Sequence, residues 1–365
     1  MRLAVACCSL MALFMAVGAA DAQQDRMRRG DDPVPVAKTA AKQKPATKRH
    51  RVARKPSATE PSAATPAPAD APAVAASRRD MPDCLQVGDQ ERQITGCTHL
   101  IDDAKQSAKV RAAAYYNRGN ARAAKNDFDD AIADYDEAIK LTPKDARVLN
   151  NRGTVYRDKG DAERAMADFA AAIKINRRYS DAHYNLGAAY AAKGETAKAI
   201  AAYGAAIAAD RRNANAYVAR GIAQLYAGAS AKAQADLRMA ARIAPTNAYA
   251  ALWNDIALRH AKRPGTFAVT GRRVDMNAWP APVVRLWRGE ITPTAMFAAA
   301  DNPNATTKQA QMCEANFYGG ELALLKGTKD DATKLLQAAA SDCPQPFLER
   351  MAASAELKAL GVKTD

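Results

Sequence analysis

Residues 152–175 read RGTVYRDKGDAERAMADFAAAIKI, two helix-forming stretches on either side of a short polar turn. Gly160 stands in that turn, and glycine is the residue that most easily takes the left-handed conformation that ends a helix. In the second stretch Ala165, Phe169 and Ala172 follow one another at helical spacing, so they share one face. The segment therefore predicts two antiparallel helices that pack against each other.

The same pattern returns every 34 residues. Four positions of the 34-residue pattern, which we call columns, hold the same kind of residue in each of four successive copies. The first is a glycine, the second an alanine, the third a large apolar residue and the fourth again an alanine. They are Gly119, Gly153, Gly187 and Gly221; Ala131, Ala165, Ala199 and Ala233; Tyr135, Phe169, Tyr203 and Leu237; and Ala138, Ala172, Ala206 and Ala240. The turn between the helices is predicted at Asn126, Gly160, Gly194 and Gly228. Small residues allow the two helices to approach closely, and the large column fills the space that remains. The segment resembles the tetratricopeptide repeat (TPR), a 34-residue helix–turn–helix unit.

This resemblance implies an all-α fold, a right-handed superhelical TPR solenoid. Its four clear units are 112–145, 146–179, 180–213 and 214–247. The same 34-residue frame fits a further TPR-like unit at 313–346. The rest of the chain is interpreted as a truncated capping helix pair at 81–111, an atypical helical region at 248–312 and a C-terminal capping helix at 347–365.

Charged residues stand at two kinds of position inside the units. Arginine replaces the leucine that is usual in the family in three units, at Arg118, Arg152 and Arg220, and only Leu186 keeps it. We expect these arginines to lay their aliphatic stems on apolar surface. A group of acids in the first unit is predicted to lie on the helix surface: Asp129, Asp130, Asp134 and Asp136.

Composition excludes several classes of protein. Hydrophobic residues make up 48% of the 365 residues, but aromatic residues only 6%, and this favours thin, alanine-rich helices over sheets. Four histidines leave little material for a metal or catalytic centre, and we expect no cofactor. His99, His183 and His260 stand apart and are interpreted as core or surface histidines. No phosphate-binding, zinc-protease or nucleophile-elbow motif is present, so the sequence predicts a non-enzymatic protein.

The first 80 residues are predicted to be an export signal and a tether. Residues 1–22 combine a basic start, an apolar run and a small-residue cleavage site, as in a signal peptide. Residues 23–80 are rich in proline and alanine and hold 13 lysines and arginines against 6 acids, half of the net charge of +14. Such a segment is expected to be disordered. It is either a solvated spacer or a tail that binds anionic lipid or cell-wall polymer; nucleic acid is not expected for an exported protein.

Four cysteines remain after the signal, an even number that is typical of disulfides in exported proteins. On the TPR frame Cys313 and Cys343 lie at the same edge of one unit, and Cys84 and Cys97 lie on two facing helices. The frame therefore predicts the bonds Cys84–Cys97 and Cys313–Cys343.

The resemblance also implies a binding groove on the first helices of the units. The sixth position of three successive units is Asn117, Asn151 and Asn185, and a primary amide offers both a donor and an acceptor to a peptide backbone. The fourth unit has Ala219 there, so the ladder stops. The residues expected to flank it are Asn120, Asn150, Tyr116, Tyr184 and Arg147.

We therefore predict a periplasmic adaptor of a Gram-negative bacterium that binds an extended protein segment. Residues 279–286 and the unit at 313–346 also resemble adaptor proteins related to peptidoglycan-hydrolase adaptor lipoproteins, although the lipid-bearing cysteine of those proteins is missing. Two alternatives stay open. One is a tethering protein that acts through its basic tail while the repeats form a homodimer. The other is a glycan-active enzyme with a site in residues 265–304.

Overall fold

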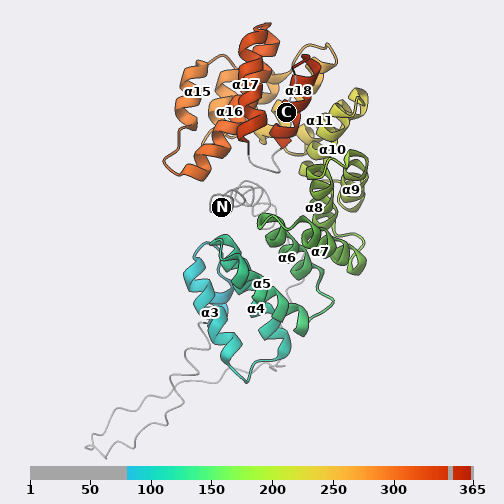
Figure 1. The fold of residues 1–365 in the computed structure, drawn as a ribbon. Helices are drawn as coiled ribbons and strands as arrows, with labels where there is room; N and C mark the ends of the chain where they lie inside the picture. The colour runs from blue at the N-terminus through green and yellow to red at the C-terminus, as the bar shows by residue number, and fades with distance from the viewer. Residues whose placement is uncertain (1–79, 344–347, 363–365) are drawn as a thin grey trace, which may run out of the picture.

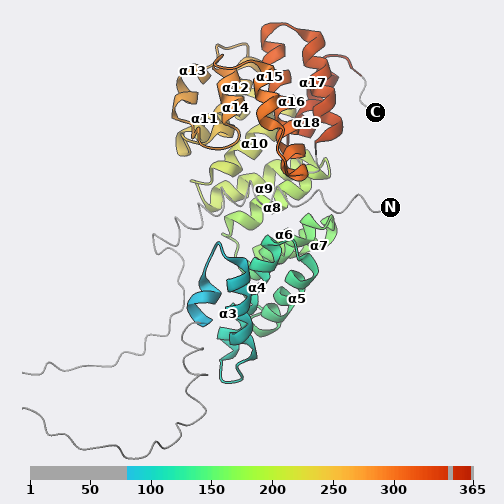
Figure 2. The same ribbon diagram turned by 90° about the vertical axis from the view of Figure 1, so that its left-hand side faces the viewer.

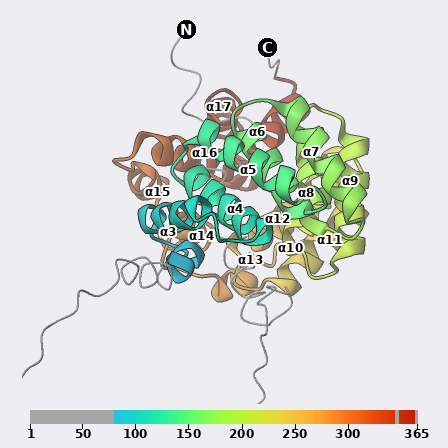
Figure 3. The same ribbon diagram turned by 90° about the horizontal axis from the view of Figure 1, so that it is seen from below.

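The computed structural model describes residues 80–343 and 348–362, and within them it contains helices and no β-strand. The predicted signal peptide and the predicted tether up to residue 79 lie outside the described residues. The helices stack into a right-handed superhelical solenoid that curves as an arc from α3 to α17 (Figure 1). Viewed from the side, the stack is elongated, with α3 at one end and α17 at the other (Figure 2). Viewed from below, successive helix pairs turn around a common centre (Figure 3).

Four antiparallel helix pairs form the central part of the solenoid. Their bounds are α4 (Ala108–Ala124) with α5 (Phe128–Leu141), α6 (Ala146–Asp158) with α7 (Ala162–Ile175), α8 (Ser180–Ala192) with α9 (Thr196–Ala209), and α10 (Ala214–Tyr226) with α11 (Ser230–Ile243). Capping side chains start many of these helices; Asp161, for example, accepts a hydrogen bond from the Arg164 backbone N–H. The turn residues Asn126, Gly160 and Gly194 have φ values of 68°, 84° and 73°, which confirms the predicted left-handed turns.

Helices also precede and follow the four pairs. α3 (Gln90–Asp102) packs on α4, and a short helical segment at 80–85 precedes it. The C-terminal part consists of α12 (Ala248–His260), α13 (Phe267–Thr270), the 3-10 helix η1 (Gly271–Arg273), α14 (Ala281–Trp287), α15 (Pro293–Ala300), α16 (Ala305–Lys326), α17 (Lys329–Asp342) and α18 (Leu348–Ala359). α16 is a long helix that starts at its cap Asn304, well before position 313 where the repeat frame begins its unit.

The glycine column explains how the helices of a pair approach each other. A Cβ atom at Gly153 would lie 2.8 Å from Phe169 Cε1, and a Cβ atom at Gly187 would lie 2.7 Å from Tyr203 Cδ1. The same relation holds in the C-terminal unit, where a Cβ atom at Gly320 would lie 2.8 Å from Leu336 Cγ. Because such distances are too short for a side chain, the large residue of each second helix packs directly on the backbone of the first.

The arginine column does more than cover apolar surface. Arg118, Arg152 and Arg220 each pair with an aspartate sixteen positions later, on the second helix of the same unit, at N–O distances of 2.7–2.8 Å. These partners are buried, with 2%, 6% and 7% exposure: Asp134, Asp168 and Asp236. The prediction that Asp134 lies on the surface is therefore wrong, because it accepts hydrogen bonds from Arg118 and Arg122 between the helices.

The C-terminal helices share one core with the fourth pair. This core extends from Ile222 and Leu225 of α10 through Trp253 of α12 to Leu357 of α18. The last helix, α18, contacts α10 as well as α16 and α17. The inner side of the fourth pair is consequently covered by the chain itself, whereas the first three pairs have small cores of their own.

The two disulfides lie at the two ends of the solenoid. Cys84 bonds to Cys97 and Cys313 bonds to Cys343, with Cα–Cα distances of 4.5 and 4.8 Å, the pairings that the repeat frame predicts. All four cysteines are buried. Cys313 lies within α16 and Cys343 directly follows α17, so their bond joins the two helices of the last unit.

Replacing Cys313 and Cys343 together by alanine is expected to lower the free energy of unfolding by about 3 kcal/mol, because the bond closes a loop in the unfolded chain. Chemical denaturation with and without a thiol reductant measures this. The reductant should destabilise the wild type and, through Cys84–Cys97, the variant to a smaller degree. Four free thiols in protein purified under non-reducing conditions would contradict the bonds.

Candidate peptide-binding surface

The first helices of the units form the inner side of the arc. α4 contacts α6, α6 contacts α8, and α8 contacts α10, whereas the second helices of the described chain make no contact of comparable extent with one another. Figure 1 agrees, since α6 and α8 face the interior of the arc while α7 and α9 lie outside them. The expected ladder positions are all on these inner helices. We call the face of α4, α6 and α8 toward the interior of the arc the inner surface.

Amide side chains form a connected row across three inner helices. Asn120 Oδ1 on α4 accepts from Asn151 Nδ2 on α6 at 2.9 Å, and Asn150 Oδ1 accepts from Asn185 Nδ2 on α8 at 2.9 Å. Asn150 Nδ2 donates to Asn151 Oδ1 at 3.2 Å and completes the link. We call Asn120, Asn150, Asn151 and Asn185 the amide row. Its bonds join neighbouring units, so the row contributes to packing between units.

Asn117 differs from the other two predicted ladder residues. It is half-buried on α4 and makes no side-chain hydrogen bond with the described residues, whereas Asn151 and Asn185 both donate to the preceding unit. The prediction of three equivalent amides did not anticipate this division. Within the described residues, the Asn117 side chain therefore keeps its hydrogen-bonding capacity.

Aromatic and basic side chains border the row. Tyr116 Oη accepts from Asn151 Nδ2 at 3.0 Å, and the Arg147 guanidinium lies 5.5 Å from the centre of the Tyr116 ring while it pairs with Asp145. Burial raises the pKa of Tyr116 and raises the pKa of Tyr184 to about 12. Both phenols therefore stay protonated near neutral pH.

The family follows from a sequence match to this part of the chain. Residues 116–183 and 150–211 each match the family model of the tetratricopeptide repeat. This part of the chain consists of TPR units. TPR units stack into solenoids whose curved surface is used for binding, so the fold is that of a protein-interaction scaffold. No curated protein matches the sequence.

Several solved TPR structures are similar over part of their length. A crystal structure of MamA is 26% identical and aligns with 41% of this chain and 82% of its own, with a TM-score of 0.38. YrrB, described as a TPR protein with an unusual peptide-binding site, is 21% identical over 52% of this chain and 91% of its own, with a TM-score of 0.39. PilF of Pseudomonas aeruginosa is 14% identical over 67% and 97%, with a TM-score of 0.44.

The structure also brings together residues that the sequence left apart. His260, interpreted from the sequence as an isolated histidine, lies beside Glu321 and Glu356. A second acidic residue, Glu314, accepts hydrogen bonds from Tyr249 and Trp279 at 2.8 Å. Neither group follows the 34-residue repeat, so no periodic signal points to them. In the part of the chain that the structure describes, no helix is long and apolar enough to cross a bilayer.

Proposed function

We propose that this TPR protein is a non-enzymatic adaptor that binds an extended protein segment along the inner surface of its first three units. The observation that carries the proposal is the line of amides from Asn117 through the amide row, which follows successive inner helices. An extended backbone presents donors and acceptors in turn, and amides match both. Few free charges accompany them, since Arg147 pairs with Asp145. This favours recognition of backbone over recognition of a charged tail.

The length of the proposed site follows from what covers the fourth unit. There Ala219, Ile222 and Leu225 are buried, and the last two share a core with Leu357 of α18. A ligand would thus lie over α4, α6 and α8 and end near α10. The same limit appears in the sequence, where the asparagine ladder stops at Ala219.

We further propose that the protein acts in the periplasm. Residues 1–22, which lie outside the described part, have the pattern of a signal peptide, and two disulfides fit an oxidising compartment. The tail at 23–80 is proposed as a basic tether whose anionic partner would be lipid or cell-wall polymer. The homodimer and an enzymatic site in residues 265–304 remain the alternatives.

The amide line is tested with peptides selected from a random library on the full chain. Asn117→Ala is expected to weaken binding of a selected peptide by about 0.5–1.5 kcal/mol, the net contribution of one neutral hydrogen bond, without lowering the melting temperature. The triple change of Asn117, Asn151 and Asn185 to alanine should weaken binding by about 1.5–4.5 kcal/mol if the sites are independent. Because Asn151 and Asn185 also join units, it should lower the melting temperature too. Isothermal titration calorimetry and thermal denaturation give the two quantities.

Lys174→Ala is the control, since Lys174 is exposed on the outer helix α7. It should leave affinity unchanged. If the asparagine variants bind as the wild type does, the inner surface is not the peptide site. If deletion of residues 23–80 alone abolishes binding, the tethering alternative replaces the adaptor.

A further inference from the structure

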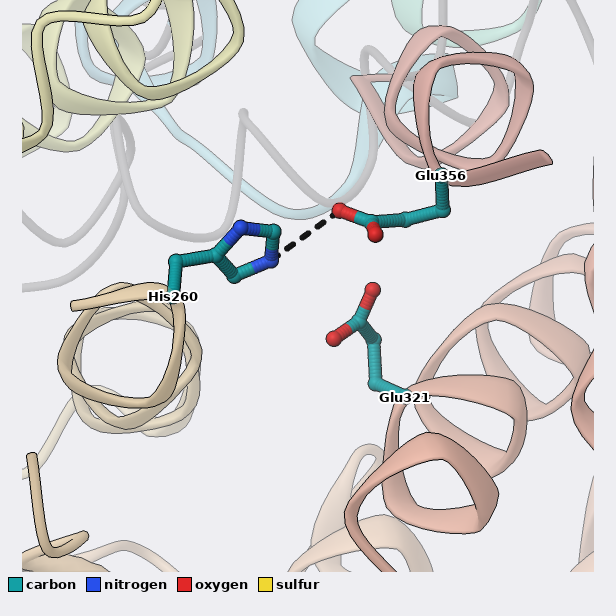
Figure 4. A group of neighbouring side chains, drawn as sticks. All are labelled: His260, Glu321 and Glu356. Atoms are coloured by element: carbon teal, nitrogen blue, oxygen red, sulfur yellow. Dashed lines mark ion pairs between the residues drawn. The ribbon is translucent and has the colours of Figure 1, made fainter. Parts of the chain in front are cut away.

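Three side chains from distant parts of the sequence meet where the C-terminal helices close on the repeats. His260 is the last residue of α12, Glu321 lies in α16 and Glu356 lies in α18. Figure 4 shows all three side chains pointing into one space. One ligand atom of each lies within 4.8 Å of the others, and His260 Nε2 is 3.0 Å from Glu356 Oε1.

A buried carboxylate oxygen beside this space lacks a hydrogen-bond partner. Glu321 and Glu356 are only 5% and 6% exposed. Oε1 of Glu321 is buried without a hydrogen bond to the described residues, whereas Oε1 of Glu356 has the His260 ring nitrogen as its ion-pair partner. Buried polar atoms are nearly always paired, so the unpaired carboxylate oxygen of Glu321 indicates a place for an ion or a water molecule.

Two buried carboxylates face a single imidazole in this space. The Arg259 guanidinium already pairs with Asp255 at 2.7 Å and lies over the Trp287 ring at 4.3 Å. A divalent cation would bind both carboxylates together with the imidazole.

We propose that His260, Glu321 and Glu356 bind a divalent transition-metal ion, with zinc as the ion that best fits one imidazole and two carboxylates. Zinc is held by histidine nitrogen and carboxylate oxygen at about 2.0–2.2 Å, with water completing a four-coordinate site. Ligand atoms around a tetrahedral ion of this kind lie about 3.4 Å apart. The three ligand atoms, which lie within 4.8 Å of one another, would have to approach by up to about 1.4 Å through side-chain rotation. Magnesium and calcium prefer oxygen alone and are disfavoured by the imidazole.

The ion would connect three helices that the repeat frame does not join. α12 continues the row of inner helices, α16 begins the last unit, and α18 lies against α10. The Tyr226 ring of α10 also meets the His260 ring edge-on, at 6.2 Å between centroids. Binding would therefore fasten α18 to the inner side of the solenoid, where it limits the proposed peptide site.

Zinc titration of the tag-free, full-length protein tests the site. The wild type is expected to bind one equivalent of zinc saturably and to gain thermal stability. His260→Ala and Glu321→Gln should each weaken zinc binding by at least about tenfold, since changes outside the first coordination sphere already cost about 10–100-fold. Cobalt in place of zinc should give a visible absorption spectrum of nitrogen and oxygen coordination that His260→Ala abolishes.

His183→Ala is the matched control, because it removes an imidazole from another inner helix, α8, and should not change zinc affinity. Glu321→Gln removes one of two facing buried carboxylates, so the metal-free variant should be at least as stable as the metal-free wild type. If Glu321→Gln does not fold, His260→Ala serves as the second test. The His260 side chain is 31% exposed, so its removal should preserve the fold. The proposal is wrong if the wild type shows no saturable zinc binding, or if His260→Ala binds zinc as the wild type does.

Discussion

Replacing Asp168 by alanine is expected to destabilise the protein by about 3 kcal/mol, and adding Arg152→Leu to that variant should restore most of the loss. Asp168 is buried and holds Arg152 with two hydrogen bonds of 2.7 and 2.8 Å. Removing one partner of a buried pair leaves the other charge uncompensated and costs about 3–5 kcal/mol. The lower figure applies here because Arg152 keeps a bond to the half-exposed Asp136.

The third unit is the natural precedent for the double change. It has Leu186 at the arginine position and Ala202 at the aspartate position, so both members of the pair are absent together. Ala202 is buried at 9% exposure, and the helices α8 and α9 pack as the other pairs do. Arg152→Leu with Asp168→Ala therefore copies an apolar solution that the same fold already uses.

A double-mutant cycle by urea denaturation measures the coupling between the two positions. We expect a favourable coupling of about 2 kcal/mol or more, within the range for contacting residues. Glu137→Ala is the control, since it removes an acid from an exposed pair with Lys140 and should cost less than about 1 kcal/mol. If the double variant is no more stable than Asp168→Ala, the expectation that apolar residues can replace Arg152 and Asp168 together is wrong.

The helix pairs could be predicted from the repeat period, because the residue type at each packing position recurs in four successive units. The left-handed residue Gly160 and the contact of Gly153 with Phe169 both belong to such columns. The aspartate column at Asp134, Asp168 and Asp236 has the same period and was visible in the sequence. The surface prediction for Asp134 is wrong because aspartate is usually exposed, and only the matching loss of Arg and Asp in the third unit indicates a buried pair.

The C-terminal contacts could not be predicted in this way. His260, Glu321 and Glu356 come from three helices, and their proximity depends on how α18 returns to α10. That return is set by a core in which residues from α10 to α18 pack together without a repeating pattern. The inner amides are an intermediate case. Their face was predicted from the family resemblance, but the bonds that distinguish Asn117 from Asn151 depend on distances between units.

Gly153→Leu is expected to unfold the second unit or to destabilise the protein by more than about 3 kcal/mol. A Cβ atom at Gly153 would lie 2.8 Å from Phe169 Cε1 and 3.1 Å from the Ala165 carbonyl oxygen. Phe169 is fully buried and has no free space to move into, so α6 and α7 would have to separate. Extra atoms in a packed core cost about 1–3 kcal/mol, and a leucine adds more than the single methyl of alanine. Circular dichroism during thermal denaturation gives the loss.

Replacing glycine by alanine should lower the free energy of unfolding at one helical position and raise it at another. At Gly153, alanine alone should destabilise by about 1–3 kcal/mol, because even its methyl group meets Phe169. At Gly204 in α9, the added Cβ atom would meet only Nη1 of Arg220, the guanidinium nitrogen that does not bond Asp236, at 3.3 Å. Alanine there should stabilise the helix by about 0.5–1 kcal/mol, because glycine loses more backbone entropy on folding. If Gly153→Ala were also neutral or stabilising, the glycine column would not be the contact that brings the two helices together, and the close packing would have to come from the alanine columns.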